Sequence, residues 1–375
     1  MRLLPALALV LVATGIVAAQ DAGTVSVYCS LDAEFSQAIL DDFERETGIR
    51  VEAAMDVEAT KTVGMVNRII SEMRAGNPRC DVYWNNELAQ TIRLKKLGCL
   101  QPYASPSAAD IPAGFKDPEH YWTGFAARAR VIIYNTDAVA ADDLPRGLND
   151  LLDARWDGKM GMAKPLTGTT LTHAGALFAL WGEEKTKTFF RDLRARDIRW
   201  ERGNAMAMRS VSNGDYAWAY TDTDDANVAL VRKAPTAIVV PDQGEGEMGT
   251  LLIPNSLAII AGARNLENAK KLVDYLLSPA VEAKLAAGRS AQIPLHPGVE
   301  APEGVLRLDR IKAMEVDWEK TADMITKHGD WLHATFDGEA GSTSEPGSKF
   351  TKFAIMLAAA AILGLGIWMA TRTRA

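Results

Sequence analysis

Short apolar runs alternate with amphipathic segments in the N-terminal part of the chain, and this alternation constrains the fold more than any other feature. Residues 24–30 form an apolar run rich in β-branched side chains, which is typical of a strand. Residues 31–47 then repeat apolar side chains at helical spacing. The same order returns twice, strand then helix, at 49–54, 61–74, 81–84 and 87–97. Such alternation through short connections predicts an α/β fold with a parallel sheet wound in right-handed units.

A second α/β pattern begins near residue 123 and ends near residue 261, where the sequence turns to helices. The first lobe would thus be formed by two separate segments of the chain, with the second lobe formed by the residues between them. We expect a discontinuous lobe 1 at 24–123 and 262–335, and lobe 2 at 124–261. Two crossing segments make a hinge, and a ligand belongs between the lobes.

Three carboxylates within four residues form the most distinctive polar segment. The apolar run 216–220 leads directly into Asp222, Asp224 and Asp225. A strand-to-helix junction of an α/β sheet lies at the carboxyl edge, where ligands bind. Carboxylates this close repel one another unless water or a cation screens them. The alternative is a helix N-terminus, in which Thr223 or Asp224 caps and the other acids complement the dipole.

Other strand-to-helix connections carry polar side chains at the same predicted edges. Asp32 follows the first strand, and residues 85–87 (Asn85, Asn86 and Glu87) follow the third. Residues 164–170 (KPLTGTT) open a helix with small hydroxyl side chains and a glycine. That arrangement suits an anion, although an ordinary threonine cap explains it equally well. Asn204 can cap its own helix or face a ligand.

Arg128 and Arg130 precede a strand that is apolar on both faces. They suit a hinge, a cleft or an exposed edge equally well.

The two ends of the chain differ from the body between them. Arg2 precedes an apolar run that ends in small residues, the pattern of a secretory signal peptide at 1–19. Residues 353–370 are uncharged and apolar with basic flanks, and a helix of this length spans about 27 Å, close to a bilayer's hydrocarbon thickness. We expect a flexible linker at 336–352 and a transmembrane helix at 353–370. The protein would be periplasmic or extracytoplasmic, anchored to the cytoplasmic membrane.

The net charge limits the possible partners, and the cysteines indicate a disulfide rather than a metal site. A formal net charge of −7 without a dense basic run argues against nucleic acid. Cys80 opens a predicted strand and Cys99 follows the helix that returns from it, so we expect a disulfide worth about 3 kcal/mol between them. Cys29 would remain single. No C-x-x-C or H-x-x-x-H spacing indicates a cysteine or histidine metal site.

Catalytic signatures are missing from the sequence. There is no G-x-S-x-G elbow, no H-E-x-x-H and no G-x-G-x-x-G after a strand, and the five histidines are scattered. We therefore expect binding, with no bond broken and no catalytic cofactor.

Several segments resemble the extracellular solute-binding proteins of ABC transporters, and most closely their ferric-iron-binding subgroup. The resemblance covers Val25 to about Leu295 and rests on VSVYCSLDAEF, FERETGIRVE, CDVYWNNELAQTIRLKKLGCLQPY, GFAARARVIIYN, WDGKMGMAKP and GTLLIPNSLAIIAGARN. It implies a two-lobe periplasmic-binding-protein type II fold that closes around a small solute and delivers it to a permease. The alternative from another class of function is an enzyme or a sensor ectodomain that closes the same two lobes around its ligand.

The resemblance also implies a ligand set, from which this chain departs. Iron-binding members take a His or Glu from the first loop, a Glu from the third and two adjacent tyrosines from lobe 2. Here Asp32 stands in the first loop and residues 221–225 stand where the tyrosines are expected. The family's synergistic-anion site matches Thr167, Gly168, Thr169 and Thr170 with Asn204.

Two ligands fit these residues, and we expect the first, Fe(III), with an amine-bearing solute as the alternative. Fe(III) with an anion would take oxygen ligands from Asp32, Asp222, Asp224 and Asp225. An amine-bearing solute, such as an aminophosphonate or a polyamine, would place its ammonium at the carboxylates and its anion at the threonines. Replacing the three clustered aspartates by alanine is expected to abolish binding and leave the fold intact. The candidate contacts are Asp32, Asn85, Asn86, Glu87, Thr167, Gly168, Thr169, Thr170, Asn204, Tyr220, Asp222, Asp224 and Asp225.

Overall fold

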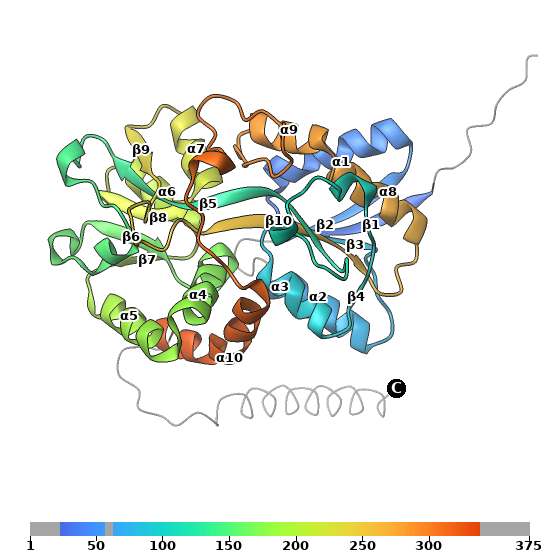
Figure 1. Cartoon of the computed structure of the whole chain (residues 1–375), viewed down its shortest axis with the longest axis horizontal. Helices are drawn as coiled ribbons and strands as arrows, with labels where there is room; N and C mark the ends of the chain where they lie inside the picture. Colours follow the sequence, from blue (N-terminus) through green and yellow to red (C-terminus); the bar gives the residue numbers. More distant parts are fainter. Residues whose placement is uncertain (1–22, 57–62, 338–375) are drawn as a thin grey trace, which may run out of the picture. The chain divides into compact units, whose positions relative to one another are not determined.

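A computed structural model describes residues 23–56 and 63–337 (Figure 1). The chain divides into two compact units, Met1–Leu332 and His333–Ala375, and the first is the subject below. The predicted signal peptide, nearly all of the predicted linker and the predicted transmembrane helix lie outside the described residues. Within the described ranges, no helix is both long enough and apolar enough to cross a membrane.

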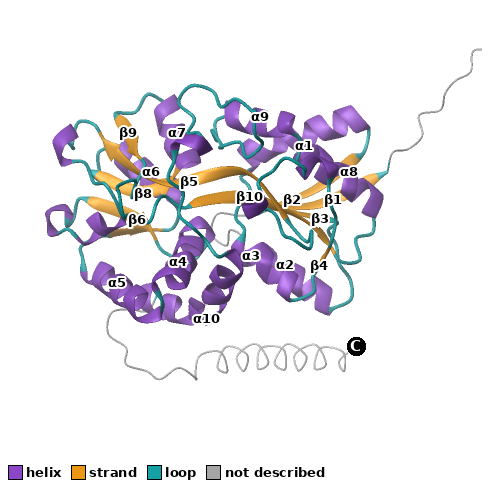
Figure 2. Cartoon of the chain, viewed as in Figure 1, coloured by secondary structure: helices purple, strands orange, loops and turns teal. Residues whose placement is uncertain are grey.

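Helices flank the strands on both sides (Figure 2), as the alternation predicts. We use lobe 1 for strands β1 to β4 with the helices packed on them. Its elements are β1 (Thr24–Cys29), α1 (Ala33–Thr47), β2 (Arg50–Met55), α2 (Val63–Arg74), β3 (Val82–Asn85), α3 (Ala89–Lys96), β4 (Leu100–Gln101), α8 (Leu266–Leu276) and α9 (Pro279–Ala287).

Lobe 2 denotes strands β6 to β9 with their helices. Its elements are β6 (Met160–Ala163), α4 (Gly168–Trp181), α5 (Glu183–Ala195), β7 (Arg199–Glu201), α6 (Asn204–Ser212), β8 (Trp218–Asp222), α7 (Thr223–Val231) and β9 (Thr236–Val239). Short 3₁₀ helices lie at Pro106–Ala108, Ala113–Phe115, Ala141–Asp143, Leu148–Leu152, Ala154–Trp156 and Leu308–Arg310.

Two long strands connect the lobes, β5 (Thr123–Asn135) and β10 (Leu252–Ile260). The strand order is β2-β1-β3-β10-β5-β8-β6-β7, with β4 beside β10 and β9 beside β5. β5 pairs with β10 through residues 123–129 and with β8 through residues 130–134. Because one continuous strand belongs to both halves of the sheet, we expect bending within β5 and β10 to move the lobes relative to each other.

The hinge strand β5 is held by a buried carboxylate. Ala126 has a left-handed φ of 43°, and its N–H donates to Glu282 Oε1 at 2.7 Å. The same carboxylate accepts from the N–H groups of Leu295 and His296 and contacts His296 Nδ1 at 2.9 Å. Glu282 thus fixes the backbone where the chain passes between the lobes.

Helix α10 (Trp318–Phe336) contacts both lobes. Gly175 of α4 lies so close to Ile325 that a Cβ there would stand 2.5 Å from the isoleucine Cγ1, and His328 stacks on Phe178 of α4 with ring centroids 4.1 Å apart. Asp323 pairs with Lys96 of α3 at 2.6 Å. The sequence predicts that residues 262–335 belong to lobe 1, whereas α10 packs on α4 of lobe 2 as well.

The predicted Cys80–Cys99 disulfide is wrong, because both residues are free thiols. Strand β10 lies between the strands that follow them: Ile260 N–H donates to Asp81 O, and Ala261 N–H donates to Cys99 O, each at 2.9 Å. Two strand spacings amount to about 10 Å, and a disulfide needs Cα atoms within about 7 Å. A helix that returns along a strand does not bring the residue before the strand close to the residue after the helix when another strand, here β10, enters the sheet between them.

Asp242 is a buried carboxylate in lobe 2 that opposes folding at neutral pH. It is 6 % exposed, and its oxygens accept only long hydrogen bonds of 3.3 and 3.4 Å from Leu148 N–H. Burial raises the pKa of Asp242 to about 6. When the pKa of a carboxyl is higher in the folded than in the unfolded state, the folded protein loses stability as the pH rises from the unfolded to the folded pKa. For Asp242 this loss persists above pH 6.

We expect Asp242→Asn to raise the free energy of unfolding by about 1–2 kcal/mol at pH 8 and to change it little at pH 4. Asparagine keeps the oxygen acceptor and tolerates the left-handed φ of 56° at this position. Urea unfolding at both pH values measures the difference, with the exposed α5 residue Asp192→Asn as control. An equal gain at both pH values would contradict this assignment.

Candidate functional site

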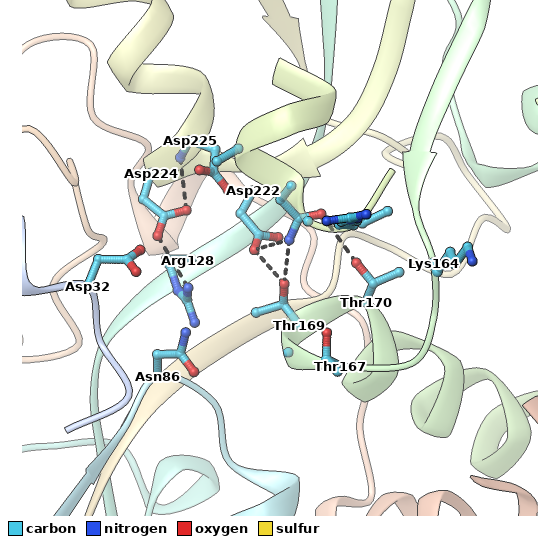
Figure 3. A pocket seen from close by; sticks show the side chains of 16 residues that line it. Asp32, Asn86, Arg128, Lys164, Thr167, Thr169, Thr170, Asp222, Asp224 and Asp225 are labelled. Atoms are coloured by element: carbon cyan, nitrogen blue, oxygen red, sulfur yellow. Dashed lines mark hydrogen bonds and ion pairs between the residues drawn. The ribbon is translucent and has the colours of Figure 1, made fainter. Parts of the chain in front are cut away.

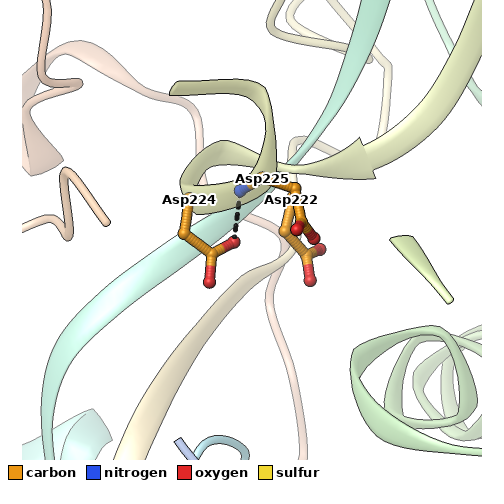
Figure 4. A group of neighbouring side chains, drawn as sticks. All are labelled: Asp222, Asp224 and Asp225. Atoms are coloured by element: carbon orange, nitrogen blue, oxygen red, sulfur yellow. Dashed lines mark hydrogen bonds between the residues drawn. The ribbon is translucent and has the colours of Figure 1, made fainter. Parts of the chain in front are cut away.

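Helix α7 begins directly at the end of β8, so the three clustered aspartates surround one junction (Figure 4). Asp222 is the last residue of β8 and occupies the N-cap position, but its side chain makes no capping hydrogen bond. Thr223 does not cap either, because its Oγ1 accepts from Ala129 N–H of β5 at 3.2 Å. Asp224 and Asp225 lie in the first turn of α7. Asp224 Oδ1 accepts from Asp225 N–H at 3.0 Å, within the first turn of α7, whereas the Asp222 side chain bonds to other segments of the chain.

Asp222 is the centre of a buried hydrogen-bond network in lobe 2. Its Oδ1 accepts from Arg130 Nη1 at 2.6 Å, and its Oδ2 accepts from Thr169 Oγ1 at 2.5 Å and Asn204 Nδ2 at 2.9 Å. Burial alone raises the pKa of Asp222, but the guanidiniums of Arg130 and Arg128 outweigh this effect and hold its pKa below the usual range. Asp222 is thus an ionised anchor for β5, α4 and α6.

Arg128 forms the second arginine–aspartate pair of the cluster. Its Nη1 lies 3.2 Å from Asp224 Oδ2, and the side chain is 3 % exposed. Among the described residues, no partner is found for Arg128 Nε and Nη2 or for Asn86 Oδ1. Figure 3 shows the guanidinium between Asp224, Asp32 and Asn86. Buried polar atoms are normally hydrogen-bonded, so these atoms indicate a place for a ligand group.

A cavity of about 40 Å³ lies between the lobes (Figure 3). Lobe 1 contributes Asp32 and Asn86, and the hinge strand β5 contributes Arg128. The remaining lining comes from lobe 2: Ala163, Lys164, Thr167, Gly168, Thr169, Thr170, Arg202, Gly203, Asn204, Ala205, Asp222, Asp224 and Asp225. The structure thus brings together ten of the thirteen predicted contact residues, from segments far apart in sequence.

The start of α4 forms one wall of the cavity. Thr167 is the N-cap residue without a capping side-chain bond, and Gly168 has a left-handed φ of 56°. The hydroxyl of Thr169 donates to Asp222, and that of Thr170 donates to Asn204 Oδ1 at 3.2 Å. The hydroxyls are thus committed within lobe 2. The first-turn N–H groups and the helix dipole remain the features that suit an anion here.

Three predicted contacts do not line this cavity. Asn85 and Glu87 are fully buried and bond to each other, Asn85 Nδ2 donating to Glu87 Oε1 at 2.9 Å. Tyr220 is 1 % exposed, with its ring centroid 5.2 Å from the Arg130 guanidinium carbon. Burial raises the pKa of Tyr220 far above its ordinary value. Asn86, between Asn85 and Glu87, and Asp222, two residues after Tyr220, line the cavity instead.

Asp222, Asp224 and Asp225 are close enough to share a cation. One carboxylate oxygen from each lies within 4.8 Å of the others. Asp32, the fourth predicted metal ligand, is not a member of that group among the described residues. Arg130 and Arg128 already neutralise two of the three carboxylates, which weakens the attraction for a cation.

Four basic residues complete the site. Lys164 and Arg202 line the cavity beside Arg128, and Arg130 pairs with Asp222 from behind. The sequence offered one signal for the arginines: charged side chains inside an apolar strand must be paired when buried. Lys164 and Arg202 carry no such signal. With four aspartates and three basic side chains in the lining, and Arg130 as the fourth cation, the formal charges sum to zero.

Comparison with known proteins identifies the protein family to which this chain belongs. The profile of bacterial extracellular solute-binding proteins matches residues 91–321. The chain belongs to this family. It is thus a solute-binding protein of an ABC importer, with a permease as partner and no enzymatic role, as the resemblance implies.

Similar proteins extend over most of this solute-binding protein. Iron uptake protein A2 of Synechocystis is 27 % identical over 288 residues, 74 % of this chain and 79 % of the relative. Iron-bound HitA from Pseudomonas aeruginosa superposes with a TM-score of 0.74 and 23 % identity, covering 82 % of this chain and 99 % of HitA. AfuA from Actinobacillus pleuropneumoniae, with fructose-6-phosphate bound, has a TM-score of 0.72 and 23 % identity, covering 83 % and 98 %. These likenesses show the α/β periplasmic-binding-protein type II fold.

Proposed function

We propose that this protein captures a small zwitterionic solute, of which 2-aminoethylphosphonate is representative, and presents it to an ABC permease. The observation that carries the proposal is the balance of charge in the cavity, where arginines are paired with two of the clustered aspartates. A site that holds both signs of charge gains most from a ligand that also carries both signs, such as an ammonium joined to a phosphonate.

The anionic group of the solute would lie at the start of α4. Lys164 and Arg202 line that part of the cavity together with the first turn from Gly168 to Thr170. A phosphonate, phosphate or carboxylate there would accept from backbone N–H groups at the positive end of the helix dipole. Arg128 presents Nε and Nη2 for a further oxygen.

The ammonium group would lie between the lobes at the opposite side of the cavity. Asp32 from lobe 1 and Asp225 from lobe 2 supply carboxylates. An ammonium held from both lobes stabilises their contact.

Fe(III) with a synergistic anion is the second candidate. The carboxylate oxygens of Asp222, Asp224 and Asp225 lie close enough to share a hard cation, and similar proteins include an iron uptake protein and iron-bound HitA. Against this candidate, no tyrosine of the described residues lines the cavity, and two of the iron ligands, Asp222 and Asp224, are already paired with arginines. The fructose-6-phosphate bound to AfuA supports an organic ligand in the same fold.

Thermal unfolding of the full-length protein in detergent distinguishes the candidates. We expect 2-aminoethylphosphonate at about 100 times its Kd to stabilise the protein by about 2.7 kcal/mol, and Fe(III) supplied with citrate to leave the melting temperature unchanged. Asp225→Asn should remove most of the response to the aminophosphonate, and Asp192→Asn on the exposed face of α5 should not. Stoichiometric iron in the purified protein, with no response to the aminophosphonate, would overturn the proposal in favour of Fe(III).

A further inference from the structure

Glu87 is a fully buried carboxylate that the ligand cavity does not use. Its exposed fraction is 0 %, and it does not line the cavity between the lobes. Within lobe 1, its Oε1 accepts from Asn85 Nδ2 at 2.9 Å and from Gln90 N–H at 3.0 Å. Its backbone oxygen accepts from Ser256 Oγ of the hinge strand β10 at 2.7 Å. Lobe 1 and the hinge therefore fix this side chain in one orientation.

The other carboxylate oxygen reaches the opposite lobe. Thr172 Oγ1 donates to Glu87 Oε2 at 2.8 Å, and Thr172 is 1 % exposed. Thr172 lies on α4, one turn after the residues Gly168 to Thr170 that line the cavity. The helix that contacts the solute at its start is thus bonded to lobe 1 four residues later.

We propose that the Glu87–Thr172 hydrogen bond is a latch that holds the two lobes in contact and so slows release of the solute. The link to solute release rests on the proposed function; the latch itself does not. Separating the lobes would break this bond and bring Glu87 into water, where the carboxylate is readily solvated. With the lobes in contact, the Thr172 hydroxyl is one of the donors that stabilise this buried carboxylate, whose charged form is opposed by burial and whose pKa is therefore raised.

Thr172→Val tests the latch because valine keeps the shape and removes only the hydroxyl. It leaves a buried carboxylate oxygen without its donor, so we expect the ratio of contacting to separated lobes to fall about tenfold. Thr172→Ser retains the hydroxyl and should behave as the wild type. Thr186→Val is a matched control, because Thr186 is also buried but donates within lobe 2, to Leu177 O at 3.0 Å.

The measurement is the distance between spin labels on the full-length, solute-free protein. Lys271→Cys on α8 and Asp192→Cys on α5 are exposed positions on different lobes, and the three native cysteines are buried. We expect a short-distance population in the wild type that Thr172→Val depletes and that Thr172→Ser and Thr186→Val retain. A wild type lacking that population, or an unchanged distribution in Thr172→Val, would overturn the latch.

Because no solute is added, this result is independent of whether the protein binds an aminophosphonate or Fe(III). Where 2-aminoethylphosphonate does bind, Thr172→Val should also raise its dissociation rate about tenfold and leave the association rate nearly unchanged. A purely structural role of Thr172 would lower the melting temperature without changing the label distances.

Discussion

Replacing Asp222 by alanine is expected to lower the free energy of unfolding by about 3–5 kcal/mol. The substitution leaves the guanidinium of Arg130, which is 0 % exposed, without its counter-charge. It also removes the acceptor of Thr169 and Asn204. The structure therefore changes the expectation that all three clustered aspartates can be removed without harm to the fold.

Urea unfolding followed by circular dichroism measures this effect, and two further variants assign its cause. Asp225→Ala, at a partly exposed position in the first turn of α7, should cost less than about 1 kcal/mol. Combining Asp222→Leu with Arg130→Met removes both charges together and should recover much of the stability. If Asp222→Ala unfolds at the wild-type urea concentration, Asp222 is not the anchor of lobe 2.

Arg128→Gln is expected to change the affinity for the two candidate ligands in opposite directions. For 2-aminoethylphosphonate the affinity should fall about 100-fold, because a charge-assisted hydrogen bond in a buried site is lost. For Fe(III) the affinity should rise, because the cation that competes for Asp224 is removed. The sign of the change thus identifies the ligand class more sharply than its size.

Isothermal titration of the wild type and Arg128→Gln with each ligand provides the measurement. Asp224 also loses its buried partner in this variant, so circular dichroism must first show that the fold is retained. Arg128→Gln combined with Asp224→Asn removes the pair and serves as the control for that stranded charge. Tighter binding of the aminophosphonate by Arg128→Gln would contradict a zwitterion that contacts this arginine.

The sequence by itself determined the fold class, because secondary structure follows from local periodicity. Strand–helix alternation and helical spacing predicted the α/β arrangement, and the family match and the superpositions confirm it. Polar residues at the carboxyl ends of strands also identified most of the cavity lining, from Asp32 through Thr167 to Asp225. These features depend on residues that are near one another in the chain.

Only the tertiary structure decided which side chains neutralise one another. Arg130 meets Asp222 across 92 positions, and Glu87 meets Thr172 across 85. The entry of β10 between two strands separates Cys80 from Cys99. Pairings of this kind depend on strand order and on the packing of the lobes, for which local sequence carries no signal. They turned an apparent cluster of free carboxylates into a charge-balanced cavity, because buried charges must find partners wherever the fold supplies them.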